Sequence, residues 1–182
     1  MQNKVLVNFV HPLYEKSKAN KALVSAINDI EGVTFNDLYE RYPDFYIDIE
    51  REQKLLLEHD VIVFQHPFYW YSSPSLLKEW QDLVLENGFA YGDGGYQLQG
   101  KQWLTAITVG GTEDSYGAGG YNQFPIELLL KPFEQTADFC GMKFLAPYVM
   151  YEALMLSDTE LADAAHQYAQ TIRHLRDGDY KS

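Results

Sequence analysis

Short apolar runs alternate along the chain with stretches in which apolar residues recur at helical spacing. The runs KVLVNFV (residues 4–10) and VIVFQ (61–65) are rich in β-branched residues, as in strands that a parallel sheet buries on both faces. WLTAITV (103–109) predicts a further strand of this kind, and VTFNDL (33–38) and KFLAPYVMY (143–151) predict two more. The pattern therefore indicates five strands.

A helix is predicted after each strand. Before the third strand, Leu23, Ala26, Ile27 and Ile30 recur at helical spacing ahead of a C-cap at Gly32, and residues 47–60 read as an acidic, exposed helix.

Three more helices follow the third, fourth and fifth strands. The first has Ser73 as its N-cap and Pro74 at its first position. The second runs from about Ile126 to Cys140 and should kink or break at Pro132 and stop at Gly141, and the third opens with a Ser157/Glu160 capping box.

Five strands that alternate with five helices, without a repeat or a linker, indicate an α/β fold with one doubly wound parallel sheet. The expected strand order is 2-1-3-4-5, as in flavodoxin-like folds. The 182 residues, 46% of them apolar, suffice for one domain that covers residues 1–182.

The composition argues against several classes of function. The formal charge of −12, with no lysine or arginine stripe, argues against nucleic acid as a partner. The one cysteine, Cys140, excludes an intramolecular disulfide and dithiol redox chemistry, so electron transfer would require a bound cofactor. The five histidines share no metal-ligand spacing, so no metal site is expected.

Nothing at the start of the sequence resembles a signal peptide, and no apolar stretch approaches the roughly 18 residues of a membrane span. We therefore expect a cytoplasmic protein without a transmembrane segment, which docks at the inner face of the membrane if a membrane protein is its partner.

The unusual residues fall in the loops after strands one, three and four: HPLYEKSKAN, HPFYWYSSP and TVGGTEDSYGAGGY. In the predicted strand order the sheet reverses direction between strands one and three, and ligands bind outside the carboxyl ends of strands at such a point. All three loops should meet at that edge, and this convergence favours a ligand site.

The first loop has the features of a phosphate site. Ser17, Lys18, Ala19 and Asn20 open a helix, whose free N–H groups and positive dipole end favour an anion. His11 lies nearby. The alternative is structural: Ser17 merely caps the helix and His11 ends the strand.

The other two loops could hold a flat ring. Phe68, Tyr69, Trp70 and Tyr71 supply rings and backbone amides that can line a flavin, although core or interface packing would use the same residues. Residues Thr108, Val109, Gly110 and Gly111 allow the backbone to approach a flat ligand closely, and their amides can stabilise negative charge on it.

At these loops the sequence resembles the flavodoxin-like NAD(P)H:quinone oxidoreductases, and most closely the KefF/KefG ancillary proteins of the glutathione-regulated potassium-efflux systems. The likeness runs through HPLYEKSKAN, LYERYPDFYIDIEREQ, VIVFQHPFYWYSSPSLLKEWQDLVLENGFAYG, TVGG and FEQTADFCGM. The resemblance implies FMN, with FAD as the alternative, and a homodimer with shared sites. It also implies hydride transfer from NAD(P)H to a quinone-type acceptor, and binding to a potassium/proton antiporter.

By matching position, the resemblance also assigns catalytic residues. Tyr116 matches a tyrosine that faces the flavin's O2 edge, and Tyr91 matches an aromatic residue that the second subunit places over the site. Quinone reductases of the family use a histidine alongside that tyrosine, where this chain has Tyr121 and Asn122. Proton delivery to the acceptor is the step that this departure affects.

The alternative function is a regulatory module that keeps flavin as a structural or sensing ligand with little turnover. An electron-carrier flavodoxin, a response regulator and a hydrolase fit less well, because the tight phosphate turn, the acidic cluster and the G-x-S-x-G elbow are missing. The choice between NADH and NADPH stays open.

Overall fold

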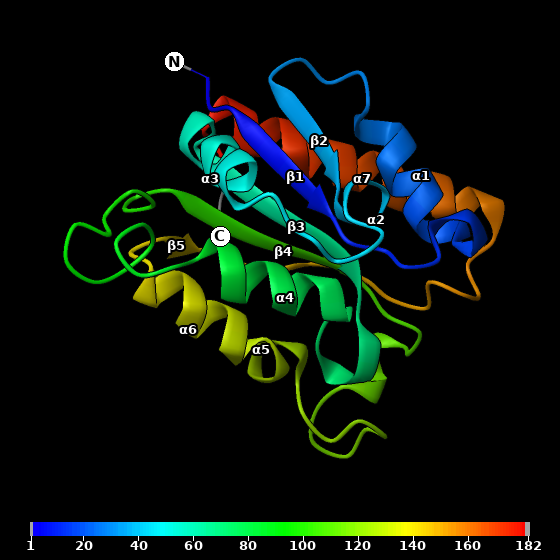
Figure 1. Cartoon of the computed structure of the whole chain (residues 1–182). Coiled ribbons are helices and arrows are strands. Elements are labelled where there is room, and N and C mark those ends of the chain that lie inside the picture. The colour runs from blue at the N-terminus through cyan, green and yellow to red at the C-terminus, as the bar shows by residue number, and fades with distance from the viewer. Residues whose placement is uncertain (1, 181–182) are drawn as a thin grey trace.

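The strands of the computed structural model, which describes residues 2–180, form one parallel sheet of six strands (Figure 1). The order is β2-β1-β3-β4-β5, with β6 also paired to β4, so the predicted order 2-1-3-4-5 is confirmed. Every residue of β1 and β3 is buried, in keeping with strands covered on both faces. The strands are β1 Val5–Phe9, β2 Val33–Asp37, β3 Val61–Pro67, β4 Gln102–Thr108, β5 Lys143–Phe144 and β6 Tyr148–Met150.

The predicted fifth strand is divided in two. β5 pairs with the start of β4 through Gln102↔Lys143, and β6 pairs with its end through Ala106↔Tyr148. Pro147, which precedes β6, has no N–H to donate to the sheet, so pairing lapses between the two strands. The count of five strands was therefore one too low, whereas the path of the chain was predicted correctly.

Helices cover both faces of the sheet (Figure 1). α1 and α7 pack against each other and bury the apolar residues of one face, whereas the other face is covered by α3, α4 and α6. The helices are α1 Lys18–Ile27, α2 Leu38–Arg41, α3 Ile49–Glu58, α4 Ser75–Val84, α5 Ile126–Leu129, α6 Lys131–Phe139 and α7 Asp158–Asp177, with short 3-10 helices at Tyr14–Lys16, Tyr69–Tyr71 and Glu113–Ser115.

Three predicted helix boundaries are confirmed. The helix that contains Pro132 breaks, because α5 ends before Leu130 and α6 begins directly after it. Gly141, with φ +71°, follows the end of α6. Ser157 and Glu160 form the reciprocal capping box of α7.

Two predicted caps were wrong. Pro74, not Ser73, occupies the N-cap of α4, and the Ser73 hydroxyl donates to the Pro74 carbonyl at 3.3 Å. Pro74 has a ψ of 148°, outside the helical range, so α4 begins one residue later than predicted. α1 ends at Ile27 with Asn28 as its C-cap, so Gly32 (φ +82°) is not its C-cap but lies in the turn into β2.

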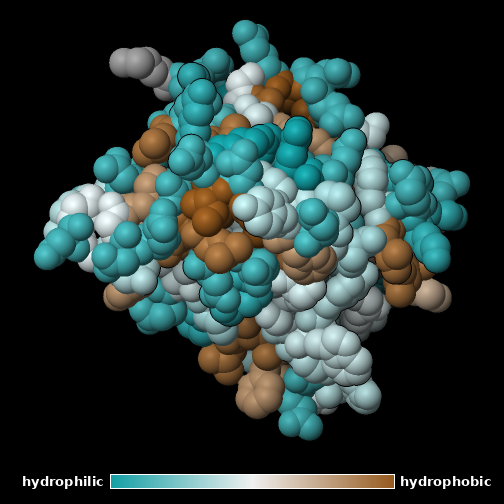
Figure 2. All heavy atoms as spheres, in the orientation of Figure 1, coloured by the Kyte–Doolittle hydropathy of each residue, from teal (hydrophilic) through white to brown (hydrophobic). Residues whose placement is uncertain are grey.

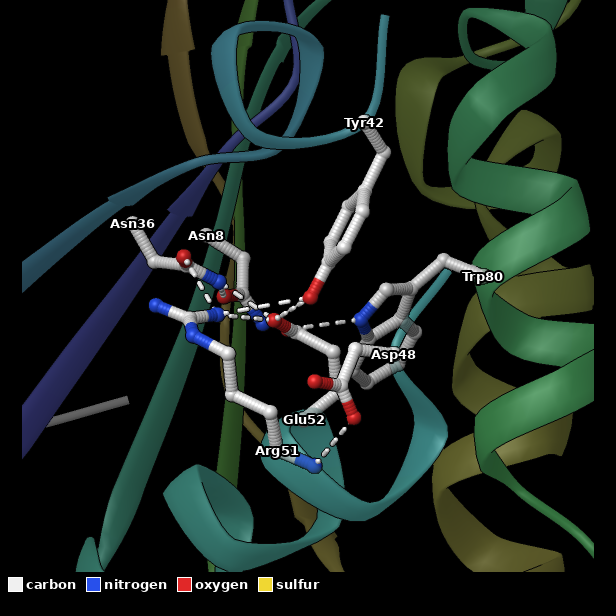
Figure 3. A network of polar contacts seen from close by, with 7 residues as sticks. All are labelled: Asn8, Asn36, Tyr42, Asp48, Arg51, Glu52 and Trp80. Carbon is white, nitrogen blue, oxygen red and sulfur yellow. Dashed lines mark hydrogen bonds and ion pairs between the residues drawn. The ribbon is translucent and has the colours of Figure 1, made fainter. Parts of the chain in front are cut away.

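A buried carboxylate anchors the connection between β2 and α3 (Figure 3). Glu52, fully buried, accepts hydrogen bonds from the Tyr42 hydroxyl (2.7 Å), the Asn36 amide (3.0 Å) and the Trp80 indole N–H (2.9 Å). Arg51 also pairs with it. Burial of the Tyr42 hydroxyl, and secondly its hydrogen bond to Glu52, raises the pKa of Tyr42 to about 12. The segment YPDFYIDIEREQ (residues 42–53) is thus folded around one buried acidic side chain.

The surface is uneven in character (Figure 2). Hydrophilic residues dominate over α2 and α3, whereas pale and brown residues dominate in the lower part of the same view, where the loops after β3 and β4 lie. Within residues 2–180 no helix combines the length and the apolar character needed to cross a membrane.

Candidate functional site

Two adjoining cavities lie at the carboxyl edge of the sheet. The main cavity has a volume of about 550 Å³ and is bounded by the loops after β1, β3, β4 and β6. The aromatic hollow, of about 360 Å³, is bounded by the loops after β3 and β4. Phe68 and Gly110 line both. The predicted convergence of three loops at one edge is confirmed, and a fourth loop joins them.

The structure distributes the predicted site residues over these two cavities. Ten of the thirteen predicted flavin contacts line the main cavity: His11, Ser17, Lys18, Ala19, Asn20, Phe68, Tyr69, Thr108, Val109 and Gly110. The other three, Trp70, Tyr71 and Gly111, line the aromatic hollow together with Tyr116 and Tyr121. Tyr91 lines neither cavity; it packs against Phe139 at a separate hollow, so within one chain it does not reach this site.

The sequence interpretation missed the fourth loop. Ala153, Leu154 and Leu156 line the main cavity from the segment between β6 and α7, and Leu161 lines it from α7 itself. This segment carries no glycine cluster or aromatic run, so composition did not single it out. The topology alone contained the signal, because a fifth parallel strand must end at the same edge as the others.

The start of α1 is built to receive an anion. The Ser17 hydroxyl accepts the Asn20 N–H at 3.2 Å, which confirms that Ser17 caps the helix. At a helix start the amides of the next residues, Lys18 and Ala19, have no acceptor within the helix, and the helix dipole adds positive potential there. Capping and anion binding are therefore compatible at this position.

Asn20 is a buried junction between the first loop and the sheet. Its amide group donates to the Ser17 hydroxyl and to the Thr108 hydroxyl, at 3.1 Å each. Its oxygen accepts from the Gln65 amide at 3.3 Å, and Gln65 accepts in turn from the Tyr168 hydroxyl of α7 at 2.9 Å. The Asn20 side chain therefore fixes the cavity wall, and its NH₂ group is committed to partners within the protein.

His11 is buried at the cavity wall as a neutral ring. Burial lowers its pKa, and the Leu13 N–H donates to its Nδ1 at 3.1 Å. Nδ1 therefore acts as the acceptor, which leaves the proton of the neutral imidazole on Nε2. His11 can donate one hydrogen bond without adding a charge.

The aromatic turn after β3 is backbone-strained. Trp70 and Tyr71 both adopt left-handed conformations, with φ values of +49° and +62°. Such conformations are costly for bulky residues and concentrate at functional sites. The turn leaves the Trp70 side chain 92% exposed beside the aromatic hollow.

The glycine loop after β4 fits tightly around Tyr116. A Cβ on Gly111 would lie 2.5 Å from the Ser115 hydroxyl oxygen and 3.1 Å from the Tyr116 ring, so only glycine fits there without rearrangement. The Tyr116 ring lies between Phe68 and Tyr151, at centroid distances of 6.4 and 6.1 Å. Burial raises the pKa of Tyr116, so its hydroxyl keeps its proton at neutral pH.

The main cavity thus joins an anion site at a helix start to an apolar slot bordered by exposed backbone and aromatic rings. The described residues contain no group of three histidine, cysteine or acidic side chains that could hold a metal ion.

Comparisons with known proteins agree with this geometry. The family model described as "Flavodoxin-like fold" matches residues 3–173. Across 170 residues the chain is 50% identical to the glutathione-regulated potassium-efflux system ancillary protein KefG of Yersinia enterocolitica, which covers 93% of this chain and 92% of that protein.

Solved structures are similar over nearly the whole chain. General stress protein 14 of Treponema denticola, in complex with FMN, is 34% identical with a TM-score of 0.89, covering 94% of this chain and 99% of that one. An NADPH-quinone reductase from P. pentosaceus is 32% identical with a TM-score of 0.84, covering 93% and 96%. A structure described as a thermophilic tryptophan halogenase from Streptomycin violaceusniger is 48% identical with a TM-score of 0.90, covering 92% and 97%. A fold shared by proteins of such different descriptions does not by itself select a reaction.

Proposed function

Because the chain belongs to the family of proteins with a flavodoxin-like fold, we propose that it binds FMN and transfers hydride from NAD(P)H to a quinone-type acceptor. The observation that carries the proposal is the main cavity, which places the anion site of α1 beside an uncharged slot for a flat ring. Neither the anion site nor the slot would, by itself, indicate a flavin.

The residues present fit FMN. A volume of about 550 Å³ lies within the usual range of small-molecule sites, roughly 300–1,000 Å³. The amides of Lys18 and Ala19 would hold the phosphate, with His11 Nε2 as a further donor. The backbone at Thr108 to Gly111, Phe68 and Tyr69 would border the ring. We propose FMN rather than FAD, since one anion site suffices for a monophosphate.

Bound FMN would supply the hydride and electron chemistry that links NAD(P)H to the quinone. The chain itself would position both partners in the aromatic hollow, where Tyr116 can donate a hydrogen bond as negative charge develops on an oxygen atom. Because its pKa is raised, Tyr116 keeps this proton across the neutral range.

Relatives support the cofactor and the reaction. The Treponema protein was solved with FMN, and the P. pentosaceus protein is described as an NADPH-quinone reductase. Both exceed 30% identity over almost the whole chain. The similarity to KefG supports a second role, as an ancillary subunit that binds a potassium/proton antiporter from the cytoplasmic side.

We also propose a homodimer. Four apolar or aromatic side chains at the rim of the two cavities are at least 79% exposed: Trp70, Tyr121, Leu154 and Met155. A second chain would cover these residues, and it would be the route by which Tyr91 reaches a flavin site.

The proposed function is tested on the purified chain. We expect a yellow protein, or an apo-protein whose melting temperature rises with FMN by several degrees. We also expect NADPH oxidation that a quinone accelerates. If neither FMN nor FAD raises the melting temperature, the flavin assignment fails.

The second candidate is a regulatory flavin module. It is favoured by the aromatic hollow, which Tyr121 and Asn122 line at the stretch where the family resemblance leads one to expect a histidine. Bound FMN together with NADPH oxidation that no quinone accelerates would select this alternative.

A further inference from the structure

Three side chains link the aromatic turn to the glycine loop across the rim of the aromatic hollow. The Tyr71 hydroxyl donates to Asn122 Oδ1 at 3.2 Å, and Asn122 Nδ2 donates to the Ser115 hydroxyl oxygen at 3.1 Å. The Ser115 hydroxyl donates to the Thr112 carbonyl at 2.6 Å. The link thus spans 51 positions of sequence between Tyr71 and Asn122. We call these three side chains the Tyr71–Asn122–Ser115 link.

Ser115 fixes the direction of the hydrogen bonds in the Tyr71–Asn122–Ser115 link. Ser115 has one hydroxyl hydrogen, and it is donated to a carbonyl oxygen, which can only accept. The contact from Ser115 to Asn122 must therefore use the asparagine NH₂ group, and the asparagine oxygen faces Tyr71. Consequently the Tyr71 hydroxyl hydrogen is committed to Asn122 and is not free for a ligand.

The link acts on the residue next to Ser115. The backbone N–H of Asn122 also donates to the Ser115 carbonyl at 2.8 Å, so Ser115 is held through side chain and main chain. Tyr116 follows Ser115 directly in the sequence, and its ring lies beside Gly111 and Phe68. The strained backbone of Tyr71 is held in place at the other end of the link.

We propose that Asn122 is a positioning residue for the acceptor: it ties the aromatic turn to the glycine loop and so fixes the Tyr116 hydroxyl over the aromatic hollow. This inference rests on the proposed function and extends it, because it assigns a role in acceptor reduction to an asparagine that lines the aromatic hollow. Asn122 acts through Tyr116 and contributes no titratable group. Turnover should therefore show no pH dependence from this position.

The test compares single and double variants. Tyr71→Phe removes one exposed hydroxyl and keeps the ring, so it should fold; Asn122→Ala removes the centre of the link. Each should lower kcat/KM for a quinone by about three- to tenfold, the usual worth of a partly exposed hydrogen bond. Anaerobic flavin reduction by NADPH, measured in the same variants, should fall less than quinone reduction does, because the Tyr116 hydroxyl is proposed to act on the acceptor. Tyr46→Phe, an exposed tyrosine away from both cavities, is the matched control.

Positioning through Tyr116 also predicts how a double variant should behave. In a Tyr116→Phe background, Asn122→Ala should cause little additional loss, because the hydroxyl that it positions is already gone. Losses that multiply would overturn the positioning role. Unchanged quinone kinetics in both single variants would overturn it as well.

Hydrogen exchange gives a readout that needs no turnover. Amides of residues 112–123 should exchange faster in Tyr71→Phe and Asn122→Ala than in wild type and Tyr46→Phe, with or without FMN. If the variants exchange as slowly as wild type and wild-type turnover is intact, the positioning role of the link is overturned while the proposed function stands. If the two variants exchange faster than wild type, but the wild-type protein neither binds flavin nor oxidises NADPH, the link stands and the proposed function is overturned.

Discussion

Asn20 holds the wall of the main cavity through hydrogen bonds that an aspartate cannot donate. Asn20→Asp would remove its hydrogen bonds to Ser17 and Thr108 and place a negative charge at the start of α1. A charge there repels the phosphate and cancels the benefit of the helix dipole. We expect FMN to bind at least about tenfold more weakly, roughly 1.4 kcal/mol, by fluorescence titration of the apo-protein.

Asn28→Asp makes the same substitution at the other end of α1, where Asn28 is exposed. This control should bind FMN as wild type does. Equal losses in both variants would mean that net charge, rather than the phosphate site, determines affinity.

Tyr116→Phe tests the proposed hydrogen bond to the acceptor. The ring keeps its contacts with Phe68 and Tyr151, so FMN affinity should change little. A hydrogen bond made in the transition state should appear as a fall in kcat on the order of tenfold. Steady-state quinone reduction measures the loss, and unchanged turnover would remove Tyr116 from the catalytic residues.

The same variant separates catalysis from antiporter activation. If activation depends on surface shape, potassium efflux in a reconstituted system should be unaffected by Tyr116→Phe. A parallel loss of efflux and turnover would show that the two activities are one.

His66 makes the stability of the chain depend on pH. Its ring is fully buried with Nε2 unpartnered among the described residues, and burial lowers its pKa from 6.5 to about 4. Between these values the unfolded chain binds a proton that the folded chain does not, so stability falls as the pH is lowered. From pH 7 to pH 5 this contribution is on the order of 2 kcal/mol.

Urea unfolding at the two pH values measures the effect. His66→Leu should show a smaller loss on acidification than wild type, whereas His166→Leu, which removes an exposed histidine of α7, should retain the wild-type dependence. Equal pH dependence in all three proteins would contradict the assignment to His66.

At the scale of elements, Glu52 determines how α3 and the segment before it are placed. Glu52→Gln keeps the shape but leaves donors from Tyr42, Trp80 and Arg51 competing for a weaker acceptor. Breaking a buried ionic network of this kind should lower the free energy of unfolding by about 2–4 kcal/mol. Glu58→Gln, at a half-exposed position on the same helix, should change it by no more than about 0.5 kcal/mol. Urea denaturation of both variants decides the matter.

Elements were predictable where local pattern and tertiary packing agree. The β-branched runs of β1 and β3, the break at Pro132 and the capping box at Ser157 are all visible in the sequence because each depends on neighbours along the chain. The displaced start of α4 was not visible, since the φ of proline suits both the N-cap and the first helical position and only its ψ of 148° places Pro74 outside the helix. The lapse between β5 and β6 depends on register against β4.

The residues of the candidate site also divide into those that the sequence predicts and those that it does not. The helix start at Ser17 to Asn20 and the aromatic turn were predictable from residue type, because phosphate and flat rings select few kinds of residue. The apolar wall from Ala153 to Leu161 was not, since leucine and alanine carry no local mark of a ligand. The tautomer of His11 and the direction of the Asn122 hydrogen bonds require three-dimensional contacts.

At the scale of the whole molecule, the exposed rim predicts self-association. Sedimentation at micromolar concentration should give about twice the chain mass of 21.0 kDa. Met155→Glu, at a rim position that lines neither cavity, should weaken the dimer at least about tenfold by placing a charge in an apolar interface. Leu57→Glu, on the half-exposed surface of α3, should not. A monomeric wild type with bound flavin would contradict the shared site.

The main cavity is closed by segments that lie far apart along the chain, and this sets the order of events during synthesis. Its walls include His11 to Asn20 and also Leu161 of α7, and α7 packs on α1 while Tyr168 supports the Asn20 junction through Gln65. A nascent chain on the ribosome has therefore made α1, which carries the proposed phosphate site, long before the helix that secures it. The proposed capture of FMN would accordingly be a late step of biogenesis, and we expect chains that stall before α7 emerges to stay colourless.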